Sequence, residues 1–410
     1  MARQIIKNIK ALVQVGENFP PYLKGKQMSE LPILENAFIA KEDGVIVEYG
    51  KMEEWGGIVD WRDIEIIDAE NQYVLPAFCD SHTHLVFAKS REEEFEGRIK
   101  GLTYEEIALN GGGILNSARK LAEMSEEELF EAAQKRLDLV MSYGTGAIEI
   151  KSGYGLSVEA EIKMLRVIKR LKENNPIAIK STFLGAHAFP QEFKENQQGY
   201  IDLIINEMLP KIAAENLADY IDIFCERNYF SLDQMHQVLE AGAKYSLIPK
   251  VHVNQFSVMG GVQKAIEFGA RSVDHLEEIS DEDIAALLES ETMPTLLPSC
   301  SHFIGIPFAQ GRRMIDAGLP IALASDFNPG STPTGNLQTV FSLACIKMKL
   351  TPEEAINALT INAAYAMNLE DTHGTISLGK KTPLLITKNI PSLAYIPYAF
   401  GDNHVDRIVI

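Results

Sequence analysis

The middle of the chain repeats one hydrophobic pattern, in which a short apolar run is followed by a segment with helical periodicity. Short apolar runs are typical of strands buried on both faces, and apolar spacings of three and four residues are typical of amphipathic helices. The pattern predicts eight strands, at 74–79, 146–151, 177–187, 220–226, 247–254, 272–276, 292–298 and 320–326. It predicts helices in most of the intervals, including 158–174, 200–216, 232–241, 260–268 and 281–288.

Eight strands that alternate with helices predict right-handed βαβ units, and therefore an α/β protein with a (β/α)8 TIM barrel. The alternative is a doubly wound open sheet, but no Gly-x-Gly-x-x-Gly motif follows an early strand. Both ends of the chain instead carry short alternating runs between turns, at 11–15, 37–40, 44–48, 64–67, 383–387 and 407–410. We expect residues 1–72 and 376–410 to form a small composite antiparallel β-sandwich domain, and residues 73–375 to form the barrel.

Composition narrows the class of protein without indicating a reaction. A hydrophobic content of 46% is ordinary for a globular protein, and no uninterrupted apolar run approaches a membrane span. Charges within the first ten residues argue against a signal peptide, and four widely spaced cysteines fit buried free thiols, so we expect a cytoplasmic protein. The net charge of −19 disfavours nucleic acid and anionic membranes as partners.

Polar and aromatic side chains stand where the predicted strands end. They are His82, His84, Tyr154, His187, His252, His275 and Asp326. In a barrel these strand ends surround one mouth, which is where the active site lies. His82 and His84 are two residues apart and project to the same side, although a lone His-x-His pair is equally often structural. The convergence of all seven side chains favours a functional site.

Three histidines and one aspartate are enough to hold a divalent ion such as zinc or iron and to leave a position for water. The other histidines, His236, His302, His373 and His404, lie in helical or loop contexts and are interpreted as structural.

Two basic residues allow more than one interpretation. Lys151 could be a carbamylated lysine that bridges two ions, but Glu149 shares its strand face, so a buried ion pair is preferred. Arg91 could bind a substrate carboxylate bidentately or form a surface ion pair with Glu92–Glu94.

The order of His82, His84, His252, His275 and Asp326 along the predicted strands resembles the amidohydrolase superfamily, in the branch with a mononuclear metal site. More narrowly, motifs at 82–91, 111–115, 151–155, 185–187, 326–331, 361–366 and 395–398 are similar to those of the imidazolonepropionase family of histidine degradation. The resemblance runs over nearly the whole chain.

This resemblance implies metal-dependent hydrolysis of the cyclic amide of 4-imidazolone-5-propanoate to N-formimidoyl-L-glutamate, by a homodimer that binds a small anionic substrate. It implies one divalent or trivalent ion per chain, zinc or iron, held by His82, His84, His252 and Asp326. It implies substrate contacts from Arg91, Tyr154, His187, Gln255, Asn328, Gly330 and Ser331. It further implies catalytic roles for Asp326, His275, His187 and Gln255.

Position 255 departs from the family pattern, which commonly has a carboxylate three residues after the histidine of strand five. Gln255 can orient water or bind a ring N–H, but it cannot take up a proton at pH 7. This argues against the related purine and pyrimidine aminohydrolases, which need a glutamate there. Another mononuclear amidohydrolase acting on a cyclic amide or amidine is the alternative enzyme, and a barrel that only binds imidazole compounds is the alternative class.

The interval between the first two predicted barrel strands is longer than a crossover requires. It contains the glycine-rich run at 110–113, which we expect to form a mobile loop over the barrel mouth.

Overall fold

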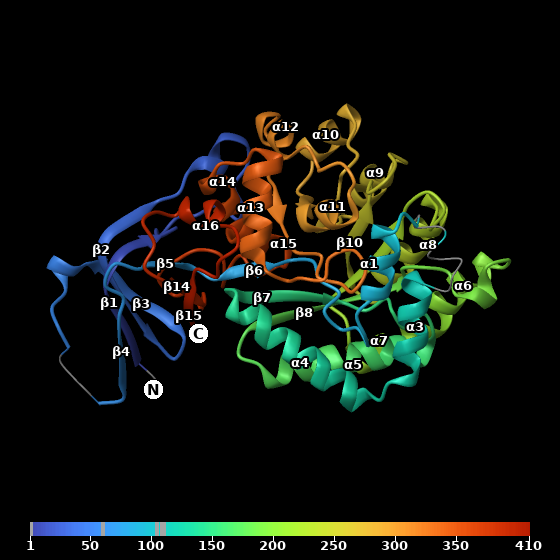
Figure 1. Ribbon diagram of the computed structural model, residues 1–410, viewed down its shortest axis with the longest axis horizontal. Coiled ribbons are helices and arrows are strands. Elements are labelled where there is room, and N and C mark those ends of the chain that lie inside the picture. The colour runs from blue at the N-terminus through green and yellow to red at the C-terminus, as the bar shows by residue number, and fades with distance from the viewer. Residues whose placement is uncertain (1–2, 59–61, 103–105, 107–111) are drawn as a thin grey trace.

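The computed structural model describes residues 3–58, 62–102, 106 and 112–410, and it contains two sheets (Figure 1). Eight parallel strands follow one another in the order β13-β12-β11-β10-β9-β8-β7-β6. They are β6 (Phe78–Asp80), β7 (Thr145–Lys151), β8 (Ala178–Ala186), β9 (Tyr220–Cys225), β10 (Ile248–Val253), β11 (Ser272–His275), β12 (Met293–Leu296) and β13 (Ala322–Leu323). The predicted fold class, a (β/α)8 barrel with a composite β domain, is confirmed.

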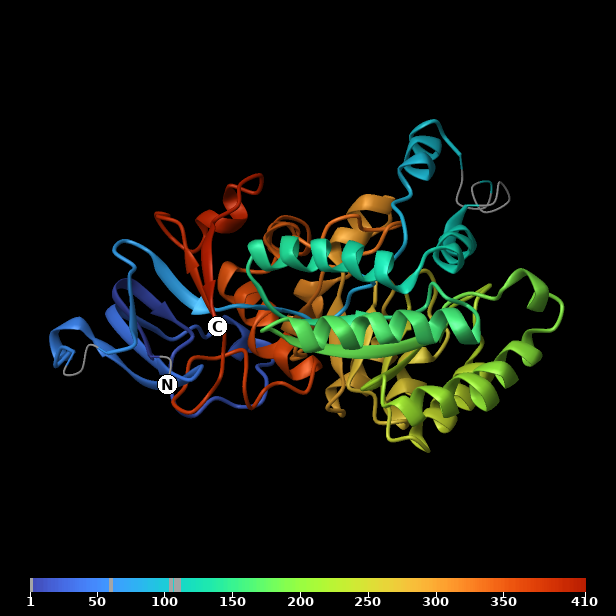
Figure 2. The ribbon, with the colours of Figure 1, turned by 90° about the horizontal axis from the view of Figure 1, so that it is seen from below.

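Helices fill the intervals between the barrel strands, and Figure 2 shows two of them, α4 and α5, side by side along the outside of the barrel. The early helices are α1 (Glu92–Ile99), α3 (Gly113–Glu123), α4 (Glu126–Ser142), α5 (Val158–Asn174), α6 (Gln197–Leu203), α7 (Leu209–Glu215), α8 (Leu232–Ala243) and α9 (Gly261–Glu267). The later ones are α10 (Asp281–Leu288), α11 (Pro298–Ile304) and α12 (Gly311–Asp316). Four more follow the last barrel strand: α13 (Leu337–Met348), α14 (Pro352–Leu359), α15 (Ile361–Ala366) and α16 (Tyr395–Tyr398). Short 3-10 helices occur at Gly25–Ser29, Met52–Glu54 and Gln191–Phe193.

The helix predicted at 200–216 differs from the observed one. It begins at Gln197, ends at Glu215, and contains a π-helical turn at Ile204–Met208 just before Pro210. Proline has no N–H to donate and crowds the carbonyl four residues earlier, so a wider turn relieves the contact.

The second sheet is built from both ends of the chain and is seen at the left of Figure 1. Its strands are β1 (Arg3–Val13), β2 (Ile33–Glu42), β3 (Val45–Lys51), β4 (Ile64–Asp68), β5 (Tyr73–Pro76), β14 (Leu384–Thr387) and β15 (Val405–Val409). The sheet is mixed rather than antiparallel as predicted, because β1 pairs parallel with β4 and β5 but antiparallel with β2. β1 changes register around Asn8, whose φ of 56° bends the strand between its two parallel partners.

The apolar run at 74–79, predicted as one barrel strand, is divided between the two sheets. β5 pairs antiparallel with β14, whereas β6 begins at Phe78 and pairs with β7. The chain crosses at Ala77, whose N–H donates to the carbonyl of Pro383 at 2.8 Å. The domain limits at 72/73 and 375/376 remain our proposal, with residues 73–76 paired into the terminal sheet.

Backbone contacts beyond β6 and β13 close the barrel. The N–H of His84 donates to the carbonyl of Phe327 at 2.9 Å, and the N–H of Asp326 donates to the carbonyl of His82 at 3.0 Å. The first and last strands therefore bring His82 and His84 beside Asp326, although these residues are far apart in the sequence.

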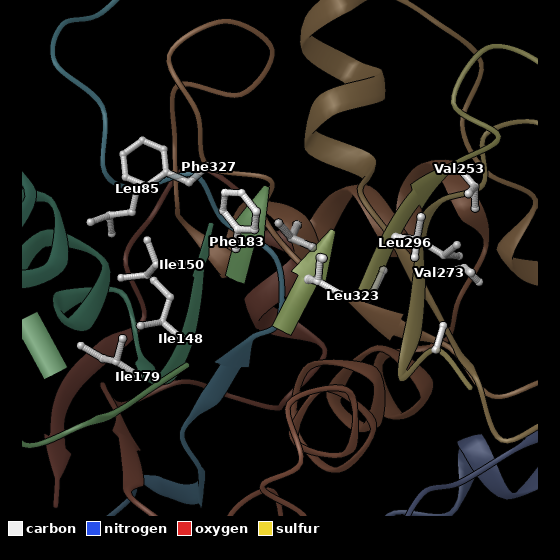
Figure 3. Packing of buried hydrophobic residues seen from close by; sticks show 14 of the residues in the cluster. Leu85, Ile148, Ile150, Ile179, Phe183, Val253, Val273, Leu296, Leu323 and Phe327 are labelled. Atoms are coloured by element: carbon white, nitrogen blue, oxygen red, sulfur yellow. The ribbon is translucent and has the colours of Figure 1, made fainter. Parts of the chain in front are cut away.

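Alternate residues of the barrel strands differ in polarity. One set is apolar and packs in the large core that includes the surrounding helices; Figure 3 labels members of it, including Ile148, Ile150, Val253, Val273, Leu296 and Leu323. The other set is polar, fully buried, and includes Glu149, Lys151, Asp222, Lys250 and Asp274. Because Lys151 on β7 contacts carboxylates on β9 and β11, this second set faces the barrel interior.

The structure also bears on the predictions for the cysteines, for membrane-spanning helices and for the loop at 110–113. All four cysteines are free as predicted, with Cys79, Cys225 and Cys300 buried and Cys345 half-buried. Within the described ranges, no helix has the length and apolar character needed to cross a bilayer. Of the expected loop at 110–113, residues 110 and 111 lie outside the described part of the chain, and Gly113 begins α3.

The side chain of Asn362 links the N-terminal segment to the barrel through hydrogen bonds, and its replacement tests how much this link stabilises the fold. Its side chain is fully buried, accepts from the N–H of Leu23 at 2.8 Å, and donates to the carbonyls of Leu23 and Ile321 at 2.9 and 2.8 Å. Asn362→Ala should lower the free energy of unfolding by about 3 kcal/mol or more, because three buried backbone groups lose their partner. Urea unfolding measures the loss.

Asn174→Ala is the matched control, since this exposed side chain donates to one helical carbonyl. It should cost less than about 0.5 kcal/mol. Equal losses for the two variants would contradict the fastening role of Asn362.

Candidate functional site

A cavity of about 680 Å³ lies at the carboxyl ends of the barrel strands. Every residue that the sequence predicted for the site lines it except one; those lining it are His84, Arg91, Tyr154, His187, His252, Gln255, His275, Asp326, Asn328, Gly330 and Ser331. The exception is His82, which is completely buried beside the cavity. The structure therefore brings the predicted residues together in one place.

Three imidazoles and one carboxylate cluster at this cavity. His82, His84 and His252 each offer a ring nitrogen within 4.8 Å of the others. Asp326 Oδ1 lies 3.6 Å from His82 Nε2 and 3.5 Å from His84 Nε2. His82 Nε2 is buried without a hydrogen-bond partner. A buried, unpartnered imidazole nitrogen among two further imidazoles and a carboxylate fits a mononuclear metal site.

A carboxylate holds each of two histidines from behind. His82 Nδ1 lies 2.7 Å from Asp274 Oδ2, and His252 Nδ1 lies 2.8 Å from Asp222 Oδ2. Each carboxylate accepts from Nδ1–H, which leaves the Nε2 lone pair available to a metal ion. Burial lowers the pKa of both histidines well below their ordinary value, so the rings stay neutral. Sequence reasoning missed both carboxylates, although each occupies an inward position of a predicted strand.

One ammonium group balances these carboxylates. Lys151 Nζ lies 3.0 Å from Glu149 Oε1, 3.0 Å from Asp222 Oδ2 and 3.7 Å from Asp274 Oδ2. The predicted buried Glu149–Lys151 ion pair is confirmed. Burial acts to lower the pKa of Lys151, but the three carboxylates raise it above the ordinary value. A charged ammonium is not a nucleophile for carbon dioxide, which disfavours the carbamylated lysine.

The Lys-Ser-Gly-Tyr-Gly motif forms a turn that holds Tyr154. Glu161, buried on α5, accepts from the N–H groups of Gly153 and Gly155 at 3.0 and 2.7 Å. A Cβ at Gly155 would lie 2.4 Å from Glu161 N, so only glycine fits. His187 Nδ1 donates to the carbonyl of Gly153 at 3.0 Å, and burial lowers the pKa of this ring to about 4. Tyr154 and a neutral His187 thus form one wall of the cavity.

Arg91 lies inside the cavity wall rather than on the surface. Its side chain is 7% exposed, and Nε and Nη1 are buried without hydrogen-bond partners. Of the two interpretations, the ion pair with a neighbouring glutamate is present, since Glu94 Oε2 lies 3.8 Å from Arg91 Nε, but it is largely buried and does not lie on the surface. A Cβ on Gly330 would fall 1.2 Å from Arg91 Nη2, so the glycine makes room for the guanidinium.

The loop after β13 is held together by Asn328. Asn328 Oδ1 accepts from the N–H groups of Gly330 and Ser331 at 2.8 and 2.7 Å. Its Nδ2 donates to the carbonyl of Asp326 and to Ser331 Oγ, both at 2.7 Å. The polar capacity of Asn328 is therefore largely used within the loop, and its contact with substrate stays a prediction.

Left-handed backbone conformations gather where the strands end. Non-glycine residues with positive φ include Asn254 (57°), His275 (90°), Leu276 (62°) and Asp326 (54°). Each costs on the order of 1–3 kcal/mol, and such strain is characteristic of functional sites. The turns direct His275 and Asp326 to the cavity, where burial raises the pKa of Asp326 to about 6.

Lys151 is expected to support both stability and metal binding. Lys151→Met leaves three buried carboxylates without their cation, so the free energy of unfolding should fall by about 3–5 kcal/mol and metal content should drop. Urea unfolding and elemental analysis measure the two effects.

Lys41→Met is the matched control, because Lys41 is also buried but its ammonium donates to the carbonyl of Thr382, away from these carboxylates. It should cost less and retain the metal. A Lys151→Met protein with native stability and metal content would contradict the charge-balance argument.

Comparison with known proteins places the chain in a family. The amidohydrolase family model matches residues 73–410. The imidazolonepropionase of Flavobacterium johnsoniae is 57% identical over 99% of this chain and 98% of its own length, and that of Christiangramia forsetii is 55% identical over the same shares. The E. coli guanine deaminase structure shares the fold with a TM-score of 0.74 at 13% identity, covering 100% of this chain and 98% of its own. The chain therefore belongs to the amidohydrolase family and, within it, to the imidazolonepropionases.

Proposed function

We propose that this protein hydrolyses the cyclic amide of 4-imidazolone-5-propanoate to N-formimidoyl-L-glutamate, in the cytoplasm and as a homodimer. Its membership of the imidazolonepropionases supports the reaction. The observation that carries the proposal is one cavity with a cluster of candidate metal-ligand side chains and a buried guanidinium whose Nε and Nη1 have no hydrogen-bond partner. The cluster of candidate metal ligands supports hydrolysis of an amide bond, and the guanidinium supports binding of the propionate carboxylate.

We assign one zinc or iron ion per chain to His82, His84, His252 and Asp326. When bound, such an ion supplies Lewis acidity and lowers the pKa of the water that it holds. The neutral state of the three histidines, each with its pKa lowered by burial, supports their assignment as ligands.

The residues of the chain supply the proton transfers and the hydrogen bonds. Asp326 accepts the proton of the attacking water on a carboxylate oxygen and returns it to the ring nitrogen when the amide C–N bond breaks. His275 donates to the carbonyl oxygen, where negative charge develops in the transition state. Water is thus added across the amide bond; its second hydrogen stays in the new carboxyl group, which releases it as a proton to form the product carboxylate.

Other cavity residues hold the substrate in place. Arg91 binds the propionate carboxylate through two parallel N–H···O bonds, which resolves the binding of an anion by a protein of net charge −19. Tyr154 and His187 hold the imidazolone ring, and Gln255 binds a ring N–H or orients the water. Gly330 and Ser331 complete the wall next to the guanidinium.

Turnover of freshly generated 4-imidazolone-5-propanoate by purified, metal-analysed protein tests the function directly. We expect loss of the imidazolone absorbance with one equivalent of N-formimidoyl-L-glutamate formed, and loss of the activity after chelation. Hydrolysis of other cyclic amides without turnover of this substrate would contradict the assignment.

His84→Ala tests the metal site. Elemental analysis should give one ion per chain for the native protein and none for the variant, with activity lost and the far-UV circular dichroism spectrum kept. His236→Ala, which alters an exposed histidine on α8, should keep both the ion and the activity. Two tightly bound ions per active chain would refute the mononuclear assignment.

Arg91→Lys tests the carboxylate site, because it keeps the charge but removes the planar fork. KM should rise about tenfold or more while kcat changes by less than about threefold. Arg166→Lys, at an exposed pair with Glu215, should leave both constants unchanged. An unchanged KM in Arg91→Ala would mean that the carboxylate is bound elsewhere.

A further inference from the structure

A buried carboxylate that contacts the cavity residue His275 has no role in the proposed reaction. Glu277 is 3% exposed and follows His275 by two residues. Its Oε1 accepts from His275 Nδ1–H at 3.5 Å and from Ser301 Oγ at 3.0 Å, and its Oε2 lies 3.3 Å from the same ring nitrogen. The contact with His275 is the only charge partner that the described residues give this carboxylate. Nothing in the predicted site included it.

The backbone brings Glu277 to this position through a strained turn. His275 and Leu276 both have positive φ, at 90° and 62°, directly after β11. Leu276 is completely buried in the hydrophobic core, which anchors the turn. Two successive left-handed non-glycine residues are costly. The turn places the carboxylate of Glu277 against Nδ1 of His275.

A carboxylate at Nδ1 determines which nitrogen of the ring faces the cavity. Glu277 accepts from Nδ1–H of His275, so Nε2 is the nitrogen left for substrate. His82 and His252 are held in the same way by Asp274 and Asp222. Three of the cavity histidines therefore share one arrangement, in which a buried carboxylate fixes the ring from behind.

We propose that Glu277 is a positioning residue that holds the imidazolium form of His275 through Nδ1–H, so that the second ring proton, Nε2–H, points at the carbonyl oxygen of the substrate. The inference rests on the proposed hydrolysis, in which His275 makes that contact. Glu277 itself does not touch the reacting atoms; its effect on the rate passes through His275.

Position 255 belongs to the same corner of the cavity. Gln255 Nε2 donates to Cys300 Sγ at 3.5 Å, and Cys300 lies within a group formed with His275 and Glu277. A second carboxylate at 255 would add a like charge near Glu277 and Asp326, which is unfavourable. The neutral amide of Gln255 is therefore consistent with a corner of the cavity in which Glu277, just after β11, already supplies a carboxylate.

A double-mutant cycle between Glu277 and His275 tests the proposal. Glu277→Gln should lower kcat by about 10–100-fold, the range for loss of a residue that orients another, with KM changed by less than about threefold and one ion retained per chain. In a His275→Gln background the same substitution should change kcat by less than about threefold, because its effect requires the imidazole.

Three results would overturn the proposal. One is a kcat for Glu277→Gln within about threefold of the native value. Another is an equal fold-loss of kcat on Glu277→Gln in the native protein and in the His275→Gln background. The third is loss of a bound ion on Glu277→Gln, which would mean that His275, Glu277 and Cys300 hold a metal ion instead.

Glu354→Gln is the matched control, since Glu354 is also buried but caps α14 and pairs with Arg312 away from the cavity. It should lower Tm and leave kcat unchanged. If Glu277→Gln fails to fold, Ser301→Ala removes the hydroxyl that holds Oε1 and should lower kcat several-fold, again only when His275 is present. An unchanged kcat in Ser301→Ala would then count against the proposal.

Discussion

The site and the barrel depend together on the buried ammonium of Lys151. Glu149, Asp222 and Asp274 stand in the barrel interior, where unpaired carboxylates would cost several kcal/mol each. The ammonium offsets that cost, and Asp222 and Asp274 accept hydrogen bonds from the histidines in front of them. The tautomers of two metal-ligand candidates are thus set by a cation that does not reach the cavity itself. Removing it would disturb the folded state and the ligand geometry at once.

A charged interior requires that hydrophobic stabilisation come from elsewhere. Barrels of this kind usually fill their interior with bulky aliphatic side chains. Here the apolar residues of the strands, such as Ile148 and Leu323, pack outward in the core that the helices share (Figure 3). The terminal sheet adds its own core, drawn from both ends of the chain, with Ile9 and Ile386 among its members. The two apolar layers stabilise the fold, and the interior positions are left for polar groups that support the site.

The parts of the structure that could be predicted from the sequence follow local rules. Short apolar runs between helical segments indicated the eight strands, and polar residues at the strand ends indicated their convergence on one mouth. The rest depends on contacts between distant segments or on unusual backbone conformations. The run at 74–79 reads as one strand, and only its antiparallel pairing with β14 shows that two sheets share it. Glu277 could not be recognised from the sequence, because no sequence pattern predicts left-handed backbone conformations at His275 and Leu276.

The loop after β13 links Asp326, proposed to act at the reacting amide, to Arg91, proposed to bind the propionate carboxylate. Asp326 belongs to the metal-ligand cluster, and Asn328 ties its carbonyl to the N–H of Gly330. Gly330 packs against Arg91, and its carbonyl accepts from Arg98 Nη2 at 2.8 Å. The guanidinium is therefore positioned relative to Asp326 by one hydrogen-bonded loop rather than by two independent elements. A fixed spacing between the proposed carboxylate site and the reacting amide defines the length of the side chain that fits, so we expect this loop to favour a propionate over a shorter or longer acid.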